Sequence, residues 1–417
     1  MKTPSILLVG VNGYASGYVK KVLDSLAEGR VSVAGVVDPT ASRCPDLAAL
    51  TAGGAPVVDT LDAFFAADGD SESLSSPALH SQKNSATLLP QRLCVENPHL
   101  GNREVDLAVV ATPIALHAEQ SRALLARGIP VLCEKPAAGC LADAKGMADA
   151  EKASGRFLAI GYQWSFSDAV QSLKRDILAG RFGAPLRMRA LVLWPRSLAY
   201  YGRNNWAGKR RDGAGREVND SPANNAMAHY LFNMLYVLGD APGTAATPSL
   251  AEVRLLRANA IETFDTVSMR LRAAGADLFF HAAHTIDEGV GPVFEYVFEK
   301  GVVRYPQAKD AAHIVATFSD GTAVDYGDPF ADQWRKLTDC LARAIDPSLS
   351  PPPCTITTAM AHTRCIEALK TIPVETVSAA QTHFVDLPDG DRLLVVDGLR
   401  ARLVSAYDRW SVLTTED

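Results

Sequence analysis

Several features that mark particular classes of protein are missing from this sequence. No apolar run in its 417 residues approaches the roughly 18 residues that a membrane span requires. The seven cysteines include no C-x-x-C pair, and their odd number argues against a disulfide framework. The net charge of −6 gives no electrostatic reason to expect a nucleic-acid partner. We therefore expect a cytoplasmic protein with reduced thiols, without a membrane segment and without a metal site.

The first third of the chain alternates between strand and helix patterns. Its predicted strands are short, nearly continuous apolar runs, which is typical of a parallel sheet covered on both faces. The apolar run at 6–11 is too short for a signal peptide and ends in a glycine turn. We expect strands at 6–9, 31–37, 57–58, 105–112 and 129–133, and helices at 19–26, 61–67 and 117–127.

The remainder follows a different pattern. Strands with alternating apolar and polar residues predict an α+β domain with a large, mostly antiparallel, open-faced sheet, a face that often carries a subunit contact. We expect a homodimer or homotetramer through this sheet. The predicted domains are 1–136, a doubly wound Rossmann domain with a loop insertion at about 69–104, and 137–417, for substrate binding and oligomerisation. Predicted helices are 141–153, 168–179, 226–238, 357–370 and 399–412, and predicted strands are 186–194, 251–258, 266–273, 277–283, 294–299, 302–305 and 313–318.

A glycine-containing turn follows the first predicted strand. In the dinucleotide fingerprint G-x-G-x-x-G, the three key positions are Gly10, Asn12 and Ala15. Asn tolerates a positive φ better than most residues, Gly13 adjoins it, and Ala is accepted where the helix crosses the strand. The alternative is a strand-to-helix turn without a ligand. We expect the turn, with Tyr14, to bind a dinucleotide.

Asp38 ends the second predicted strand, where a carboxylate would bind the ribose hydroxyls of the adenosine. Its charge repels a 2′-phosphate and so favours NAD over NADP. Arg43 keeps NADP open, because it would pair with that phosphate if the loop folded back.

A more specific stretch runs from Ala111 to Ala138. Together with the N-terminal turn it resembles the Gfo/Idh/MocA family of NAD(P)-dependent oxidoreductases. The similarity continues through 161–163 and 180–183 to Asn225-Ala-Met-Ala-His229, which matches the family's D-x-x-x-H position. The residues that carry it are Thr112, Pro113, His117 and, above all, Glu134-Lys135-Pro136.

The resemblance implies roles for these residues. Thr112, Pro113, His117 and Glu134 would line the cofactor site, and Glu134 would neutralise Lys135 or touch the cofactor ribose. Lys135 would lie beside the nicotinamide and polarise the reacting oxygen, or act as a base if its pKa is depressed. His229 would carry the proton. The sequence departs from the family at Asn225, since an amide holds no negative charge but still binds a substrate hydroxyl. Ser165, where many relatives have arginine, is a second departure.

Aromatic and basic residues gather between 194 and 211. Flat rings beside forked donors suit a polyhydroxylated substrate, so Arg196, Tyr201 and Trp206 are predicted, with Asn225 and His229, to bind it in a cleft between the domains. Arg196, Arg203 or Lys209 would alternatively take a carboxylate or phosphate. The competing interpretation is a solvated loop with its rings in the core.

These expectations converge on reversible hydride transfer between NAD and a secondary alcohol of a sugar, inositol or sugar acid. Two other functions stay open. One is a glycosidase-type enzyme in which bound NAD oxidises the sugar transiently, with no net redox change. The other is a non-catalytic NAD(P) sensor, which has no need of Lys135 and His229.

Overall fold

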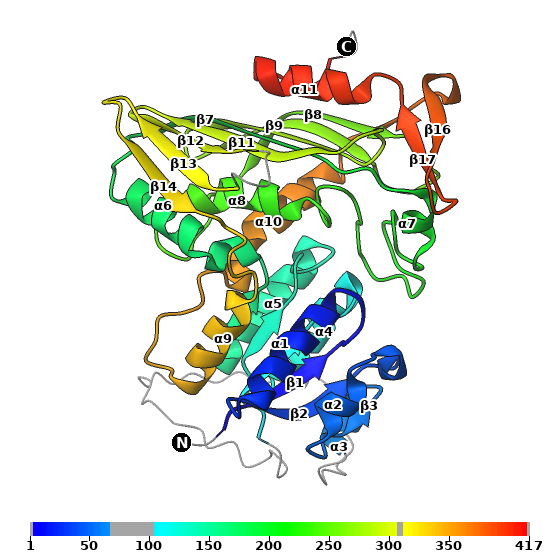
Figure 1. The fold of residues 1–417 in the computed structure, drawn as a ribbon, viewed down its shortest axis with the longest axis vertical. Helices are drawn as coiled ribbons and strands as arrows, with labels where there is room; N and C mark the ends of the chain where they lie inside the picture. The colour runs from blue at the N-terminus through cyan, green and yellow to red at the C-terminus, as the bar shows by residue number, and fades with distance from the viewer. Residues whose placement is uncertain (1–2, 67–103, 307–311, 415–417) are drawn as a thin grey trace, which may run out of the picture.

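The computed structural model describes residues 3–66, 104–306 and 312–414, and these form two large sheets with helices packed around them (Figure 1). The insertion expected at 69–104 lies outside the described residues, apart from its last residue. None of the described helices combines the length and the apolar character needed to cross a bilayer.

The first sheet has six parallel strands in the order β3-β2-β1-β4-β5-β6. This is the doubly wound order, and the predicted fold class is confirmed. Its sixth strand lies beyond residue 136, where the sequence places the domain boundary; that boundary stays a prediction. The strands are β1 (Ser5–Val9), β2 (Ser32–Val37), β3 (Val57–Val58), β4 (Leu107–Val110), β5 (Val131–Cys133) and β6 (Leu158–Ile160).

Apolar burial explains these strands. Every residue of β1, β4, β5 and β6 is buried, as expected for strands covered on both faces. The connecting helices are α1 (Ser16–Ala27), α2 (Leu47–Thr51), α3 (Leu61–Ala66), α4 (Ile114–Leu125), α5 (Leu141–Ser154) and α6 (Asp168–Leu178), with short 3-10 turns η1 (Gly13–Ala15), η2 (Ala41–Arg43) and η3 (Gln163–Phe166).

The second sheet has nine strands in the order β14-β13-β12-β11-β7-β10-β9-β8-β15. It is mostly antiparallel, as predicted, with β10 parallel to β7 and β15 parallel to β8. A two-stranded hairpin, β16 with β17, follows it. The strands are β7 (Pro185–Leu193), β8 (Ser249–Arg257), β9 (Thr266–Ala273), β10 (Ala276–Ala283), β11 (Val290–Phe298), β12 (Gly301–Tyr305), β13 (Ile314–Phe318), β14 (Ala323–Gly327), β15 (Val374–Thr376), β16 (Thr382–Asp386) and β17 (Arg392–Val396).

Both faces of the second sheet carry helices (Figure 1). Helices α6, α8 and α10 lie on the side that faces the first sheet, and α11 lies on the other. The sequence predicts an outer face that is open for a subunit contact. Part of that face is covered, because Leu399, Leu403 and Ala406 of α11 pack against Leu191 and Leu193 of β7. The remaining helices are α7 (Leu198–Gly202), α8 (Ala228–Val237), α9 (Arg335–Ile345), α10 (Ile356–Leu369) and α11 (Leu399–Arg409), with a 3-10 turn, η5, at Ala379–Gln381.

Helix α9 joins the two halves of the chain. It follows β14 in sequence but packs against β4 and β5 of the parallel sheet and against η3. The Trp334 ring, just before α9, lies 4.9 Å from that of Tyr18 on α1. A Cβ atom at Gly17 would lie 2.2 Å from this indole, so α1 admits the ring only because residue 17 lacks a side chain.

Candidate active site

The glycine-rich turn lies at the switch point of the parallel sheet, between β1 and β4. Gly10 has a φ of +89°, and a Cβ atom there would lie 2.9 Å from the carbonyl oxygen of Ala111. Gly13 has a φ of +62° with open space above it. Asn12 has a φ of −105°, so the predicted reason for an asparagine there, tolerance of a positive φ, is wrong. Gly13 supplies the left-handed residue instead.

The Asn12 side chain binds the neighbouring loop. Its amide donates to the Asp38 carboxylate at 3.1 Å and to the Thr40 carbonyl at 2.9 Å. Asp38 also accepts from the Val11 N–H at 3.0 Å, and from the N–H and the hydroxyl of Thr40, both at 2.7 Å. The Asp38 carboxylate therefore fixes the turn against the end of β2 and already accepts several hydrogen bonds from the chain. Its predicted contact with a ribose stays a prediction.

The turn fits a dinucleotide. Helix α1 begins directly after it, and its N-cap residue, Ala15, gives no side-chain hydrogen bond to the first turn. The positive end of a helix dipole attracts anions such as a pyrophosphate, although the N–H groups of Ala15 and Ser16 are already bonded within the 3-10 turn that precedes α1. The first turn of α1 also holds no acidic residue that would repel one. Gly13 leaves room for close approach, and Tyr14, 50% exposed, borders the turn.

The loop after β4 is tied to the turn after β5 by a buried histidine. His117 Nδ1 lies 2.9 Å from the Pro136 carbonyl oxygen, and Nε2 lies 2.8 Å from that of Thr112. Burial lowers the pKa of His117, and a neutral ring can donate to only one of the two carbonyls. Pro113 caps α4, and the Thr112 hydroxyl donates to Gln120. His117 thus links the predicted cofactor loop to the Glu134–Pro136 turn.

Glu134, at the carboxyl end of β5, is buried and bound from several elements. Its Oε1 accepts the Tyr18 hydroxyl at 2.6 Å and is paired with the Lys336 ammonium of α9, while its Oε2 accepts the Lys135 N–H at 3.1 Å. Burial raises the pKa of Glu134, but the charge and hydrogen bonds of Lys336 and Tyr18 bring it below its ordinary value. The expected neutralisation of Lys135 by Glu134 is not what these contacts show, because Lys336 takes that position.

The Lys135 ammonium points towards the start of α8. It donates to the main-chain carbonyl of Asn225 at 2.9 Å. Burial lowers the pKa of Lys135 to about 8; Glu134 and Asp220 raise it, and Lys336 lowers it. A lysine with such a pKa exchanges a proton near neutral pH.

His229 lies in the first turn of α8. Its Nδ1 atom is buried without a hydrogen-bond partner, and its ring meets that of Tyr162 edge-on at 5.8 Å. Burial holds the pKa of His229 well below its usual value, and the charges of Lys135, Lys336 and His362 lower it further. Asn225 precedes the helix in a turn, so the expectation that Asn225 and His229 share a helix face is wrong. The turn directs the Asn225 carbonyl to Lys135 instead.

The sequence did not predict two charged residues near these side chains, one acidic, Asp220, and one basic, Lys336. Asp220 is buried, accepts the Asn225 amide at 2.7 Å and the Gly208 N–H at 2.7 Å, and has its pKa raised by burial. Its position five residues before Asn225, in a Ser/Pro/Asn-rich stretch, suggested only a loop. Lys336 was missed because helix α9 was not predicted at all.

The predicted aromatic and basic residues lie together in the loop around α7. The Arg196 guanidinium lies 4.9 Å from the Tyr200 ring, and the Tyr201 hydroxyl lies 2.9 Å from His284 Nδ1. Arg203 stacks on Tyr200 at 3.6 Å and lies 5.2 Å from the ring of Trp206. The charge of Arg203 acts on Asp220, which places this loop next to the Lys135 region. Direct contact of Arg196, Tyr201 and Trp206 with a substrate stays a prediction.

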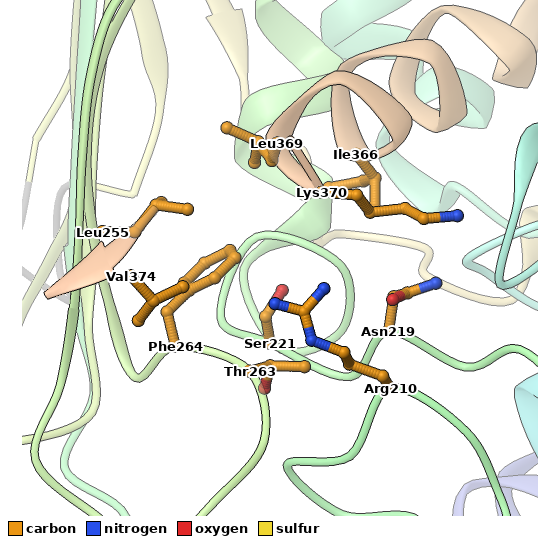
Figure 2. A pocket seen from close by; sticks show the side chains of 10 residues that line it. All are labelled: Arg210, Asn219, Ser221, Leu255, Thr263, Phe264, Ile366, Leu369, Lys370 and Val374. Carbon is orange, nitrogen blue, oxygen red and sulfur yellow. The ribbon is translucent and has the colours of Figure 1, made fainter. Parts of the chain in front are cut away.

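A separate hollow lies between β8, β15, the end of α10 and the loop at 210–221 (Figure 2). The Arg210 guanidinium points into it, whereas the Lys370 ammonium points away, towards its partners Glu217 and Glu367. Neither Lys135 nor His229 lines this hollow. We place the candidate active site at the carboxyl edge of the parallel sheet because the unusual titrating groups converge there.

The N-terminal part of the chain is similar to known oxidoreductases. Residues 5–162 match the family described as "Oxidoreductase family, NAD-binding Rossmann fold". The inositol 2-dehydrogenase of Rhodococcus erythropolis is 29% identical over 182 residues, which are 43% of this chain and 42% of that protein. Inositol 2-dehydrogenase 4 of Saccharopolyspora erythraea is 41% identical over 86 residues, 20% of this chain and 25% of that protein. The matched part thus spans less than half the length of either relative.

A solved structure extends the likeness to both sheets. The WlbA dehydrogenase of Bordetella pertussis, solved in complex with NADH and UDP-GlcNAcA, superimposes with a TM-score of 0.61 at 21% identity. The superposition covers 88% of this chain and 95% of that one. At this identity the likeness establishes the fold of the second half and nothing more.

Proposed function

We propose that this chain is an NAD-dependent dehydrogenase acting on CH–OH groups, because residues 5–162 match the Gfo/Idh/MocA family model, described as an oxidoreductase family with an NAD-binding Rossmann fold. The proposed substrate is an inositol or another polyhydroxylated, sugar-like molecule, in keeping with the names of the relatives that match its N-terminal part. One observation carries the proposal. Lys135, a half-buried lysine whose ammonium donates to the main-chain carbonyl of Asn225, lies just after β5, in the same sheet as a turn that fits a dinucleotide.

The cofactor would be held by the main chain of Gly10–Ala15 and the first turn of α1, with Asp38 and Thr112 at the ends of the neighbouring strands. NAD, when bound, supplies a nicotinamide ring that takes up a hydride. The Asp38 carboxylate just after β2 favours NAD over NADP.

The side chains of the protein must accept the proton of the substrate hydroxyl. In the oxidation, the substrate C–H hydrogen leaves with two electrons, and the O–H proton must go to a base. The neutral amine of Lys135 is the stronger base of the two candidates, since its pKa is about 8 whereas that of His229 lies well below 6.5. We therefore assign proton uptake to Lys135 Nζ, the base role that the sequence left open for it, and not to His229, to which the family resemblance gave the proton.

His229 would bind the substrate as a neutral ring. Its buried Nδ1 has no partner in the chain, and a buried polar atom without a partner is costly unless a ligand supplies one. Asn225 keeps the Lys135 ammonium in place through its carbonyl, and Asp220 holds the Asn225 amide. Together these contacts fix the distance between Lys135 and the start of α8.

The test combines binding with turnover. NAD and NADP are titrated into the full chain by calorimetry, and a panel of inositols, sugars and sugar acids is then screened with either cofactor at 340 nm, with Lys135→Ala as the blank. We expect NAD binding and NADH formation with at least one polyol. NAD that copurifies and stays oxidised while a glycosidic bond is cleaved would favour transient redox instead. A chain that binds no cofactor contradicts the proposal.

A further inference from the structure

The buried ammonium of Lys336 has an unusual set of neighbours. The side chain is 0% exposed and pairs with Glu134; its Nζ lies 3.2 Å from the Tyr14 hydroxyl and 3.5 Å from the Gly161 carbonyl oxygen. It also lies 5.0 Å from the ring centres of both Tyr14 and Tyr18, and 5.5 Å from that of Trp334. A buried cation needs such pairing, because desolvation is expensive. We call Tyr14, Tyr18, Glu134, Trp334 and Lys336 the Glu134 cluster.

The Glu134 carboxylate lies next to two lysines, but only the Lys336 ammonium pairs with it. Glu134 directly precedes Lys135 in the chain, yet it binds only the main-chain N–H of that residue. The Lys135 ammonium turns to the Asn225 carbonyl, and the ammonium that pairs with Glu134 comes from α9, 202 residues later. Without Lys336, Glu134 would be a buried, uncompensated charge next to the Lys135 backbone.

We propose that Lys336 is a positioning residue for Lys135: it neutralises Glu134, so that this carboxylate does not capture the Lys135 ammonium, which stays directed at the substrate side near Asn225 and His229. The proposal rests on the function proposed above. It also explains why Tyr14, in the glycine-rich turn, contacts the same ammonium: one cation joins the cofactor turn to the turn that carries Lys135.

The other charged groups around Lys135 do not offer it a competing ion pair. Asp220 is occupied by the Asn225 amide and the Gly208 N–H. Burial lowers the pKa of each neighbouring histidine, so the rings are neutral near pH 7, with His362 at about 4. The groups that face Lys135 are Glu134, Lys336 from α9, Asp220 from the loop before α8, His229 from α8, His362 from α10 and His117 from α4. Glu134 has the larger effect of the two carboxylates on the pKa of Lys135, and Lys336 offsets it, so the Glu134–Lys336 pair together with Asp220 sets the negative charge that Lys135 meets.

The experiment measures the titration of Lys135 without cofactor or substrate. The full chain is treated with acetic anhydride across a pH series, and mass spectrometry gives the extent of acetylation at Lys135, with the exposed Lys20 as the internal control for the reagent. The variants are Lys336→Arg, Lys336→Met, Glu134→Gln and the double variant Glu134→Gln/Lys336→Met. Circular dichroism confirms that each is folded.

Opposite shifts are expected for the two single charge removals. Lys336→Met should raise the pH midpoint of Lys135 acetylation by ~1 pH unit or more, since the negative charge of Glu134 then acts on Lys135 without compensation. Glu134→Gln should lower it, because the Lys336 charge remains uncompensated. Lys336→Arg and the double variant should both stay near the wild-type midpoint.

A merely structural role for Lys336 predicts equal midpoints in all folded variants, and that result would overturn the proposal. If Lys336→Met does not fold, Glu134→Gln and the double variant decide the question. A Lys135 acetylation midpoint that falls in Glu134→Gln and returns to the wild-type value in the double variant requires the charge of Lys336. Failure of the proposed function is seen separately, as a wild-type chain that binds no NAD in calorimetry while its Lys135 titration is unaffected.

Discussion

The Glu134 cluster and the aromatic loop around α7 are both rich in rings and cations, but they are held together differently. In the Glu134 cluster, β5, α1, α9 and the glycine-rich turn each contribute a side chain, and the contacts span up to 322 residues of sequence. In the loop, His284 and Asp391 hold Tyr201 and Ala199 from afar, but the segment after Tyr201 has local bonds: Arg203 donates to the Tyr200 carbonyl, and the Asn204 side chain accepts the N–H groups of residues 206 and 207. Atoms held from several elements have one available arrangement, whereas this locally bonded segment can adjust to a ligand. We infer that the first region supports the chemistry and the second selects the substrate.

The largest test of this comparison is the removal of Lys135. Lys135→Ala should lower kcat of the proposed oxidation by about 10²–10⁴-fold, because the proton acceptor is lost, while NAD affinity changes little. Turnover at 340 nm and calorimetry measure the two quantities. Lys20→Ala is the matched control, with wild-type values in both. A Lys135→Ala chain with near-normal kcat would remove the chemistry from this region.

The next effect concerns His229. His229→Ala should lower kcat/KM by about 10–100-fold through loss of a substrate hydrogen bond that strengthens in the transition state. Since its ring is already neutral, we expect no change in the pH dependence of the remaining activity. A His229→Ala variant whose remaining kcat/KM no longer depends on pH would show instead that His229, and not Lys135, carries the proton.

The pH profile itself distinguishes the two candidate bases. For wild-type chain, kcat/KM should rise with pH through about 8, because the pKa of Lys135 lies at about 8 and the deprotonated amine is the proton acceptor. The rate is therefore low below that pKa and reaches a plateau above it. A limb centred below 6.5 would assign the proton to a histidine.

A smaller effect is expected in the glycine-rich turn. Gly10→Ala places a Cβ atom 2.9 Å from the Ala111 carbonyl oxygen at a φ of +89°, so the turn must shift. We expect a loss of about 1–3 kcal/mol in unfolding free energy, measured by urea denaturation, together with weaker NAD binding. Gly54→Ala is the matched control, since its φ is +83° but no atom lies within 4 Å of its added Cβ. Equal losses in both variants would attribute the effect to backbone conformation alone.

The smallest effect belongs to the aromatic loop. Arg196→Ala should raise KM for the substrate several-fold and leave kcat nearly unchanged, since the guanidinium would bind ground state and transition state alike. Steady-state kinetics with saturating NAD measures both. An equal drop in kcat would mean that this loop, too, takes part in the chemistry.

Short-range patterns in the sequence predicted much of this architecture. The parallel strands and the alternating strands of the second sheet follow from local apolar periodicity, and the glycine-rich turn follows from motif spacing. The Glu134-Lys135-Pro136 turn was singled out by the family resemblance. Such patterns do not report which residue pairs with which. Lys336 looks like a solvated lysine, because only its packing against β4 and β5 buries it. The Asn225 turn and the partners of Asp38 were likewise missed, because each depends on contacts with distant or non-periodic segments.

Helix α11 has a consequence for association. With Leu399, Leu403 and Ala406 turned inward, the layer it presents outward includes Arg400, which pairs with Asp287 and Glu288. Any copy of the chain that docks there meets ionic groups before it meets strands, so the strength of that contact should fall as salt is added. Deleting residues 398–417 would expose the apolar side chains of β7 that α11 covers. Dimers or aggregates formed through that apolar surface should be insensitive to ionic strength.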